Sequence, residues 1–237
     1  MKISEKNWIA YRDKLAAINS KAATEMQAFI DANGFGNFDE IIDYAYSLTS
    51  KYGEAAAELA CQMYDSIAAV QNAKVKSAEP AETSNYGNVK SAVNSASHTT
   101  NGIPAAVGKL VKQAGADTML RNAKRDGAEF AWIPSGDSCA FCRMLASQGW
   151  QKAGKSTVSR AAHIHSHCRC EYAVRFDGKS QVEGYDPDTY YGEYKNADGT
   201  KWRDKIKAME RSDYAKNADV INARKRAEYA ARMDKDK

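Results

Sequence analysis

The sequence predicts a mainly α-helical protein, with a helical N-terminal region and a small α+β module, stabilised by zinc, in its C-terminal half. Three observations predict this fold class. Apolar side chains recur at helical spacing through the first third of the chain. Two short apolar segments, 130–133 and 171–176, have the composition of strands. Four of the five cysteines fall within 139–170, in two tight pairs.

The composition is ordinary for a soluble globular protein, and the positive charge is concentrated at one end. Hydrophobic residues make up 43% and charged residues 27% of the 237 residues. The net charge is +4, and residues 201–237 hold twelve Lys/Arg against seven Asp/Glu. No apolar run approaches the roughly 18 residues of a membrane helix, and residues 1–20 lack the apolar core of a secretory signal. We therefore expect no membrane segment and a reducing, intracellular compartment.

Helices are predicted on both sides of a polar stretch. They are expected from Trp8 to a stop at Asn33-Gly34, over 38–50, over 54–77, over 104–127, and from about Lys201 onwards. Lys51-Tyr52-Gly53 is expected to separate the second from the third, and Pro104 to begin the fourth. Cys61 lies alone in the third and is expected to be a small buried apolar side chain.

The remaining segments divide the chain into regions. Residues 79–102 are rich in Ser, Asn, Thr and Gly, which is typical of a loop, an extended arm or a hinge. The Tyr-rich stretch 185–194 is also expected to be a loop. The predicted regions are a helical N-terminal region (1–78), a flexible linker or arm (79–103), a helix plus zinc-binding module (104–178), and a Tyr-rich loop with a basic helix (179–237).

Two Cys/His pairs at matching spacing predict one structural zinc ion. Cys139 and Cys142 have a two-residue gap, which lets both thiolates bind one ion from a tight turn. After residues 143–164, His165 and Cys168 repeat that spacing, and Cys170 follows. A metal-free thiol turn is the alternative, whereas a redox pair lacks the surrounding βαβ pattern.

The ligands that complete the shell stay open at this point. Spacing favours His165 and Cys168 as the second pair of ligands, but Cys168 with Cys170, or His165 with Cys170, is also sterically possible. His163 and His167 are nearby spares, expected on the surface or beside the ligands. Because thiolates dominate and a fourth protein ligand is at hand, the shell should be closed, so the zinc should stabilise rather than catalyse.

The cysteine region resembles a known family. Residues 137–149 followed by 165–170 resemble the C-terminal signature of phage minor head proteins, also called head-morphogenesis or minor capsid proteins. Residues 121–133 are similar to the helix and strand that lead into it, and the likeness covers about 104–176. The resemblance implies ligands to a structural zinc ion at shared positions, namely Cys139, Cys142, His165, Cys168 and Cys170.

The resemblance also implies a function. It implies a structural protein of the virion rather than an enzyme, present in few copies near the portal vertex and active in head assembly or DNA delivery. Its partners would be the portal protein or the major capsid protein. Its locations would be the virion and, during assembly, the host cytoplasm.

Other interpretations stay open from the residues. The basic tail is either a solvated helix face or a surface for packaged DNA or an acidic partner. The histidine density of 163–168 is compatible with a zinc-stabilised His-metal nuclease, although no second-site partner stands downstream of Cys170. A host zinc-containing module that binds nucleic acid or protein is the third interpretation.

Overall fold

The protein folds as two compact units, each described here by itself. The computed structural model describes residues 2–97, 102–136, 138–155 and 169–235. Unit 1 comprises Met1–Ser138 and Gln148–Tyr185, and unit 2 comprises Cys139–Ser147 and Asp186–Lys237. The described residues are mainly helical with a small antiparallel sheet, which confirms that part of the predicted fold class. The four regions drawn from composition stay a prediction.

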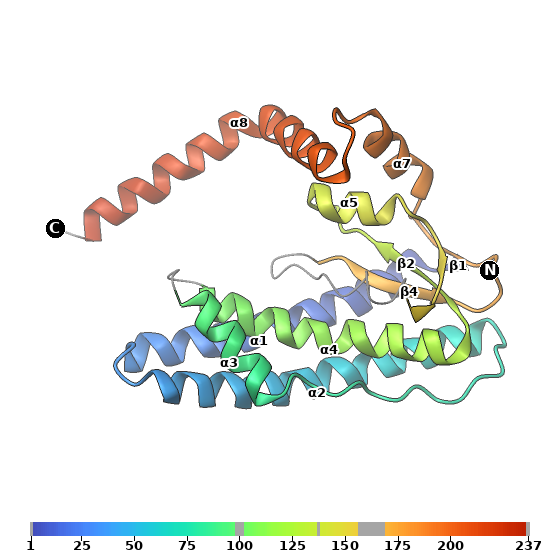
Figure 1. Ribbon diagram of the computed structural model, residues 1–237, viewed down its shortest axis with the longest axis horizontal. Coiled ribbons are helices and arrows are strands. Elements are labelled where there is room, and N and C mark those ends of the chain that lie inside the picture. Colours follow the sequence, from blue (N-terminus) through green and yellow to red (C-terminus); the bar gives the residue numbers. More distant parts are fainter. Residues whose placement is uncertain (1, 98–101, 137, 156–168, 236–237) are drawn as a thin grey trace. The chain divides into compact units, whose positions relative to one another are not determined.

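Three long helices form the body of unit 1. They are α1 (Glu5–Asn33), α2 (Phe38–Val70) and α4 (Gly102–Asp126), and they lie side by side (Figure 1). The side chains of Ser4 and Asn37 cap the first two by accepting backbone N–H bonds. Small residues line the contacts, and an added Cβ at Gly115 would lie 3.3 Å from the Ala56 carbonyl oxygen. The helix backbones therefore approach closely.

The structure joins the second and third predicted helices into one. Lys51, Tyr52 and Gly53 continue α2 instead of breaking it, and α2 ends at Val70 rather than near Ser77. Gly53 is buried, and a Cβ there would lie 2.8 Å from Thr83 Cγ2 and 3.6 Å from Ala114 Cβ. Because glycine has no side chain, it leaves room for these neighbours. The close packing offsets the roughly 1 kcal/mol of helix propensity that glycine loses relative to alanine.

The segment 73–85, expected to belong to a helix end and a loop, is extended and held along α2 and α4. The Asn122 side chain accepts from the Glu79 N–H (3.0 Å) and donates to its carbonyl (2.8 Å), as a neighbouring strand would. Thr118 Oγ1 accepts from Ala81 N–H (2.9 Å), and Asp65 accepts from Ala78 N–H (2.7 Å). Two buried side chains, Asn122 and Thr118, and the half-buried Asp65 therefore supply hydrogen-bond partners for the backbone of this segment.

Helix α3 (Tyr86–Ala96) follows, inside the stretch for which a linker was predicted. The Asn85 side chain caps it by accepting from Asn88 N–H. Val89 and Val93, one turn apart, are completely buried against neighbouring helices. The polar composition concealed a helix because only these two apolar residues are needed to pack so short an element.

The sheet of unit 1 packs against α2 and α4 (Figure 1). Its order is β3 (Gln151–Lys152), β2 (Glu129–Ile133) and β4 (Glu171–Arg175), all antiparallel, and the two longer strands confirm the predicted ones. A separate parallel pair joins β1 (Lys2–Ile3) to β5 (Gln181–Val182). Thus the first residues of the chain pair with a segment close to the end of unit 1.

A buried ion pair ties the sheet to the helices. Lys112 Nζ of α4 lies 3.6 Å from Glu171 Oε1 of β4, and the two side chains are 2% and 4% exposed. The Lys112 ammonium also lies over the Trp132 ring, 5.7 Å from its centroid. Burial and the nearby Glu171 charge raise the pKa of Tyr11 on α1 well above its ordinary value. Two helices and both long strands therefore surround one buried charge pair.

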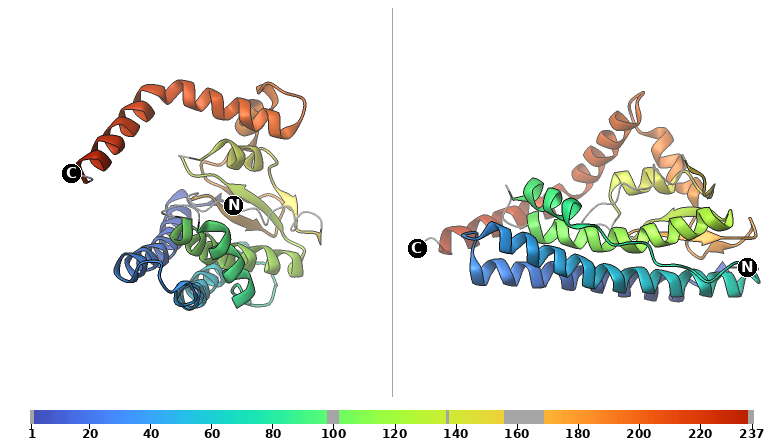
Figure 2. Two further views of the ribbon diagram at one scale, coloured as in Figure 1. Left: turned by 60° about the vertical axis from the view of Figure 1, so that its left-hand side comes forward. Right: turned by 60° about the horizontal axis from the view of Figure 1, so that its bottom comes forward.

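Unit 2 is helical, with α5 (Ala140–Ala146), α7 (Pro187–Asn196) and α8 (Trp202–Lys235). Figure 2 gives two further views of these helices. Helix α7 occupies the stretch expected to be a Tyr-rich loop, because Asp186 caps it and Pro187 suits its first turn. Ala140 and Met144 of α5 are buried with Ile206 and Met209 of α8. Among the residues that the structure describes, no helix is long and apolar enough to span a membrane.

We predict that Asn122→Ala destabilises the fold by about 1–3 kcal/mol, because it removes the side-chain hydrogen bonds to the N–H and C=O of Glu79, each of which contributes about 0.5–1.5 kcal/mol. Urea unfolding measures the loss, and hydrogen exchange of Ala78–Ala81 should speed up locally. Gln27→Ala is the matched control, since that amide bonds only within α1, to Asp31. Equal exchange in both variants would contradict the role of Asn122.

We predict that Lys112→Met costs about 3–5 kcal/mol of unfolding free energy, because it leaves the Glu171 carboxylate buried without its cation. The double variant Lys112→Met/Glu171→Leu should recover much of the loss. Lys51→Met is the control, since Lys51 pairs with Glu25 at an exposed position and should change stability little. A double variant as unstable as the sum of the single ones would argue against a coupled pair. Chemical denaturation of the wild type, the single variants Lys112→Met and Glu171→Leu, the double variant and the Lys51→Met control decides it.

Candidate metal centre

The start of α5 presents two thiols one helical turn apart. Cys139 is the N-cap residue, with extended backbone (φ −70°, ψ 163°), and Cys142 lies in the first turn. The Arg143 N–H donates to the Cys139 carbonyl oxygen at 3.1 Å, which closes this turn. Cys139 is exposed and Cys142 is buried. Residues three apart on a helix share a face, so this arrangement fits the two-thiolate half of a zinc site.

Cys170 lies directly before β4 and is completely buried. The Ser135 N–H donates to its Sγ at 3.3 Å, and Ser135 Oγ lies 3.7 Å from the same sulfur. The β2–β4 register, which pairs Ile133 with Glu171, brings these two residues together. A hydrogen bond donated to sulfur favours the thiolate, the form that binds a metal. Cys170 thus has the surroundings of a metal ligand held by an outer partner.

The rest of the predicted ligand set lies outside the described residues. His165 and Cys168 fall in 156–168, as do the spares His163 and His167. In the part of the chain that is described, no three His, Cys, Asp or Glu side chains cluster in a way that could hold a metal ion. Cys139 and Cys142 belong to unit 2 and Cys170 to unit 1. The five-residue ligand set and the closed shell stay predictions.

Cys61 differs from these cysteines in its surroundings. It is buried on α2, as predicted, and its pKa is raised to about 11, first by burial and then by the charges of Glu58 and Asp65. Such a thiol is protonated at neutral pH and is a poor nucleophile and metal ligand. Cys61 therefore serves as an internal reference for the reactive cysteines.

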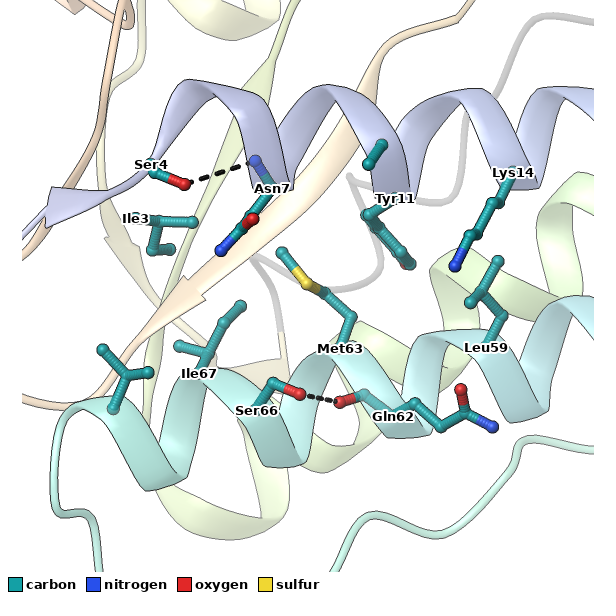
Figure 3. A pocket seen from close by; sticks show the side chains of 12 residues that line it. Ile3, Ser4, Asn7, Tyr11, Lys14, Leu59, Gln62, Met63, Ser66 and Ile67 are labelled. Carbon is teal, nitrogen blue, oxygen red and sulfur yellow. Dashed lines mark hydrogen bonds between the residues drawn. The ribbon is translucent and has the colours of Figure 1, made fainter.

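A groove of about 390 Å³ lies between α1 and α2 (Figure 3). Its lining includes four apolar side chains of α2, namely Leu59, Met63, Ile67 and Val70. Of the described residues that line it, Lys14 is the charged one, and Asn7 and Gln62 add amides. The groove is a mixed apolar and polar surface without a pair of acid and base groups among its lining residues.

Sequence reasoning assigned no role to Ser135 or Arg143, and it missed the buried Glu171. Ser135 was part of a predicted turn, and its sulfur contact depends on strand register. Glu171 had a usable signal, because an acidic residue opens a segment that is otherwise apolar up to Val174. Arg143 directly follows Cys142 in a seven-residue helix, and its partners stand 50 and 70 positions further along the chain, so no local signal marked them.

Comparison with known proteins places this mainly helical chain, with its cysteine-bearing helix, among viral proteins. The family model described as VG15 protein matches residues 2–197, which is most of the chain. The chain belongs to the VG15 protein family. The match includes α5 and α7 and ends before α8. No curated protein and no solved structure matches the chain.

We predict that, in metal-free reduced protein at pH 8, an alkylating reagent modifies Cys139 before Cys61, Cys142 and Cys170. Cys139 is exposed, whereas a thiol with a pKa of about 11 such as Cys61 is ionised to only about one part in a thousand at that pH. Peptide mass spectrometry measures each rate. Added Zn²⁺ should slow labelling of Cys139 and leave Cys61 unchanged. Undiminished labelling of Cys139 with zinc would contradict its role as a ligand.

Proposed function

We propose that the chain is a non-enzymatic minor capsid protein of the head-morphogenesis type, stabilised by a structural zinc ion. The observation that carries the proposal is the Cys139/Cys142 pair at the start of α5 in a chain that belongs to a viral family. Family membership supports the viral setting. The likeness of residues 137–149 and 165–170 to minor head proteins supports the finer role.

The residues would act on the metal as ligands and as supports. Cys139 and Cys142 would supply two thiolates, and the remaining ligands would be drawn from His165, Cys168 and Cys170. The N–H of Ser135, 3.3 Å from Cys170 Sγ, would orient that sulfur and favour its ionised form. Bound zinc supplies local folding free energy, because the thiolates and imidazole bind it only when the segment is folded.

The partners would be the portal protein or the major capsid protein, and packaged DNA is a further candidate. The basic surplus of 201–237 supports contact with an anionic surface, and most side chains of α8 beyond Ser212 are exposed. Such contact weakens as salt rises, because bound Lys and Arg release counterions from phosphate. Retention of the full chain on DNA at low salt, lost at high salt, would support this part.

We predict that the reduced protein binds one zinc ion per chain and is present in virions in few copies. Elemental analysis measures the metal, and quantitative mass spectrometry of purified particles measures the protein. Cys142→Ser should abolish stoichiometric zinc, and Cys61→Ser should retain it, since Cys61 is buried and protonated. Zinc binding without the chain in particles would overturn the virion role alone. A metal-free wild type found in particles would overturn the zinc site alone.

A further inference from the structure

The α5 helix is too short to hold the Cys139/Cys142 turn by itself. It has seven residues, and isolated helices shorter than about 12–15 residues are marginal in water. Its geometry must come from tertiary contacts within unit 2. Ala140 and Met144 supply part of them by packing on Ile206 and Met209 of α8. Partly buried side chains around this core, Phe141, Leu145, Tyr194 and Ala197, extend the contact to α7.

Arg143 supplies the polar part of this contact. Its Nε lies 3.0 Å from both Oε1 and Oε2 of Glu193 on α7. Its Nη2 lies 2.6 Å from Oδ2 of Asp213 on α8. One guanidinium thus binds carboxylates that stand 50 and 70 positions further along the chain. A planar guanidinium suits such a double contact in a way that a lysine ammonium does not.

The same residue closes the cysteine turn through its backbone. The Arg143 N–H donates to the carbonyl of Cys139, and Arg143 is bonded directly to Cys142. Its side chain is 15% exposed. Burial lowers the pKa of Arg143, but the Asp213 hydrogen bond and the Glu193 charge outweigh burial, so the pKa lies above its ordinary value. The cation therefore stays charged and fixed between its two carboxylates.

We propose that Arg143 is a positioning residue for the metal-binding thiols, and that α7 and α8 are the scaffold against which it fixes them. This inference rests on the proposed zinc site. Arg143 does not touch the metal in this scheme; it holds the backbone that carries Cys139 and Cys142. Glu193 lies within the residues matched by the family and Asp213 lies beyond them, so this chain completes the support with a segment outside the match.

Zinc binding and the packing of α5 on α7 and α8 must be thermodynamically linked in this arrangement. If fixing α5 favours zinc binding, then zinc binding must favour the packing of α5 on α7 and α8 by the same free energy. Metal occupancy should therefore slow amide hydrogen exchange in α7 and in the part of α8 around Ile206 and Met209. A role of Arg143 in general stability alone would produce no such dependence on the metal.

The test uses the full-length protein and four variants. Arg143→Lys keeps the charge and removes the planar double contact, and Asp213→Asn and Glu193→Gln remove one carboxylate each with little change of shape. Arg211→Ala is the matched control, an exposed arginine on α8 close to Asp213. Zinc release to a chromogenic chelator is timed, and the absorption of the Co²⁺-substituted protein reports the ligand geometry. Far-UV circular dichroism checks that each variant is folded.

We expect Arg143→Lys to release zinc roughly 10–100-fold faster, as is typical when an outer partner of a metal ligand is lost, and its cobalt spectrum to change. Arg211→Ala should match the wild type in both. Two results would overturn the positioning role without contradicting the zinc site. One is wild-type release rates and spectra in Arg143→Lys, Asp213→Asn and Glu193→Gln. The other is amide hydrogen exchange in α7 and α8 that does not change when zinc binds. A wild type that binds neither Zn²⁺ nor Co²⁺ would overturn both.

Discussion

The buried ion pair between Lys112 and Glu171 is the contact on which unit 1 depends. It fixes β4 against α4 with two charges that have almost no access to water, and neither can be left unpaired without a large loss of stability. Cys170 directly precedes Glu171, so the same contact fixes the position of its thiol near Ser135. The packing of β4 on α4 and the placement of a predicted metal ligand therefore depend on the adjacent residues Glu171 and Cys170.

Buried and half-buried polar side chains supply the backbone hydrogen bonds that regular structure would otherwise make elsewhere in unit 1. Asn122, Thr118 and Asp65 bond to the backbone of 78–81, and this extended segment therefore needs neither a sheet nor apolar side chains. Because these bonds go to backbone groups, they constrain the residues of α2 and α4 more than the residues of the segment itself. A polar, loop-like composition is the natural result.

Two different kinds of contact hold the described cysteines of the motif in place. In unit 2, a short helix carries Cys139 and Cys142 and is held by an apolar contact and by Arg143. In unit 1, strand register brings an N–H donor to Cys170. Membership of the VG15 protein family supports a viral setting. The proposed zinc ion would add local folding free energy to a segment with few apolar residues.

The sequence by itself determined the features whose signals are local. The stop at Asn33-Gly34 and the helix start near Pro104 act within a few residues, as do the two apolar strands and the Cys139/Cys142 spacing, and each was predicted. Only the tertiary structure decided that Gly53 continues a helix, that Glu79 bonds to Asn122, and that Arg143 joins Glu193 to Asp213. Those partners stand 30 to 70 positions apart. A chain carries no local mark of such contacts, because they exist only once folding has brought the two stretches together.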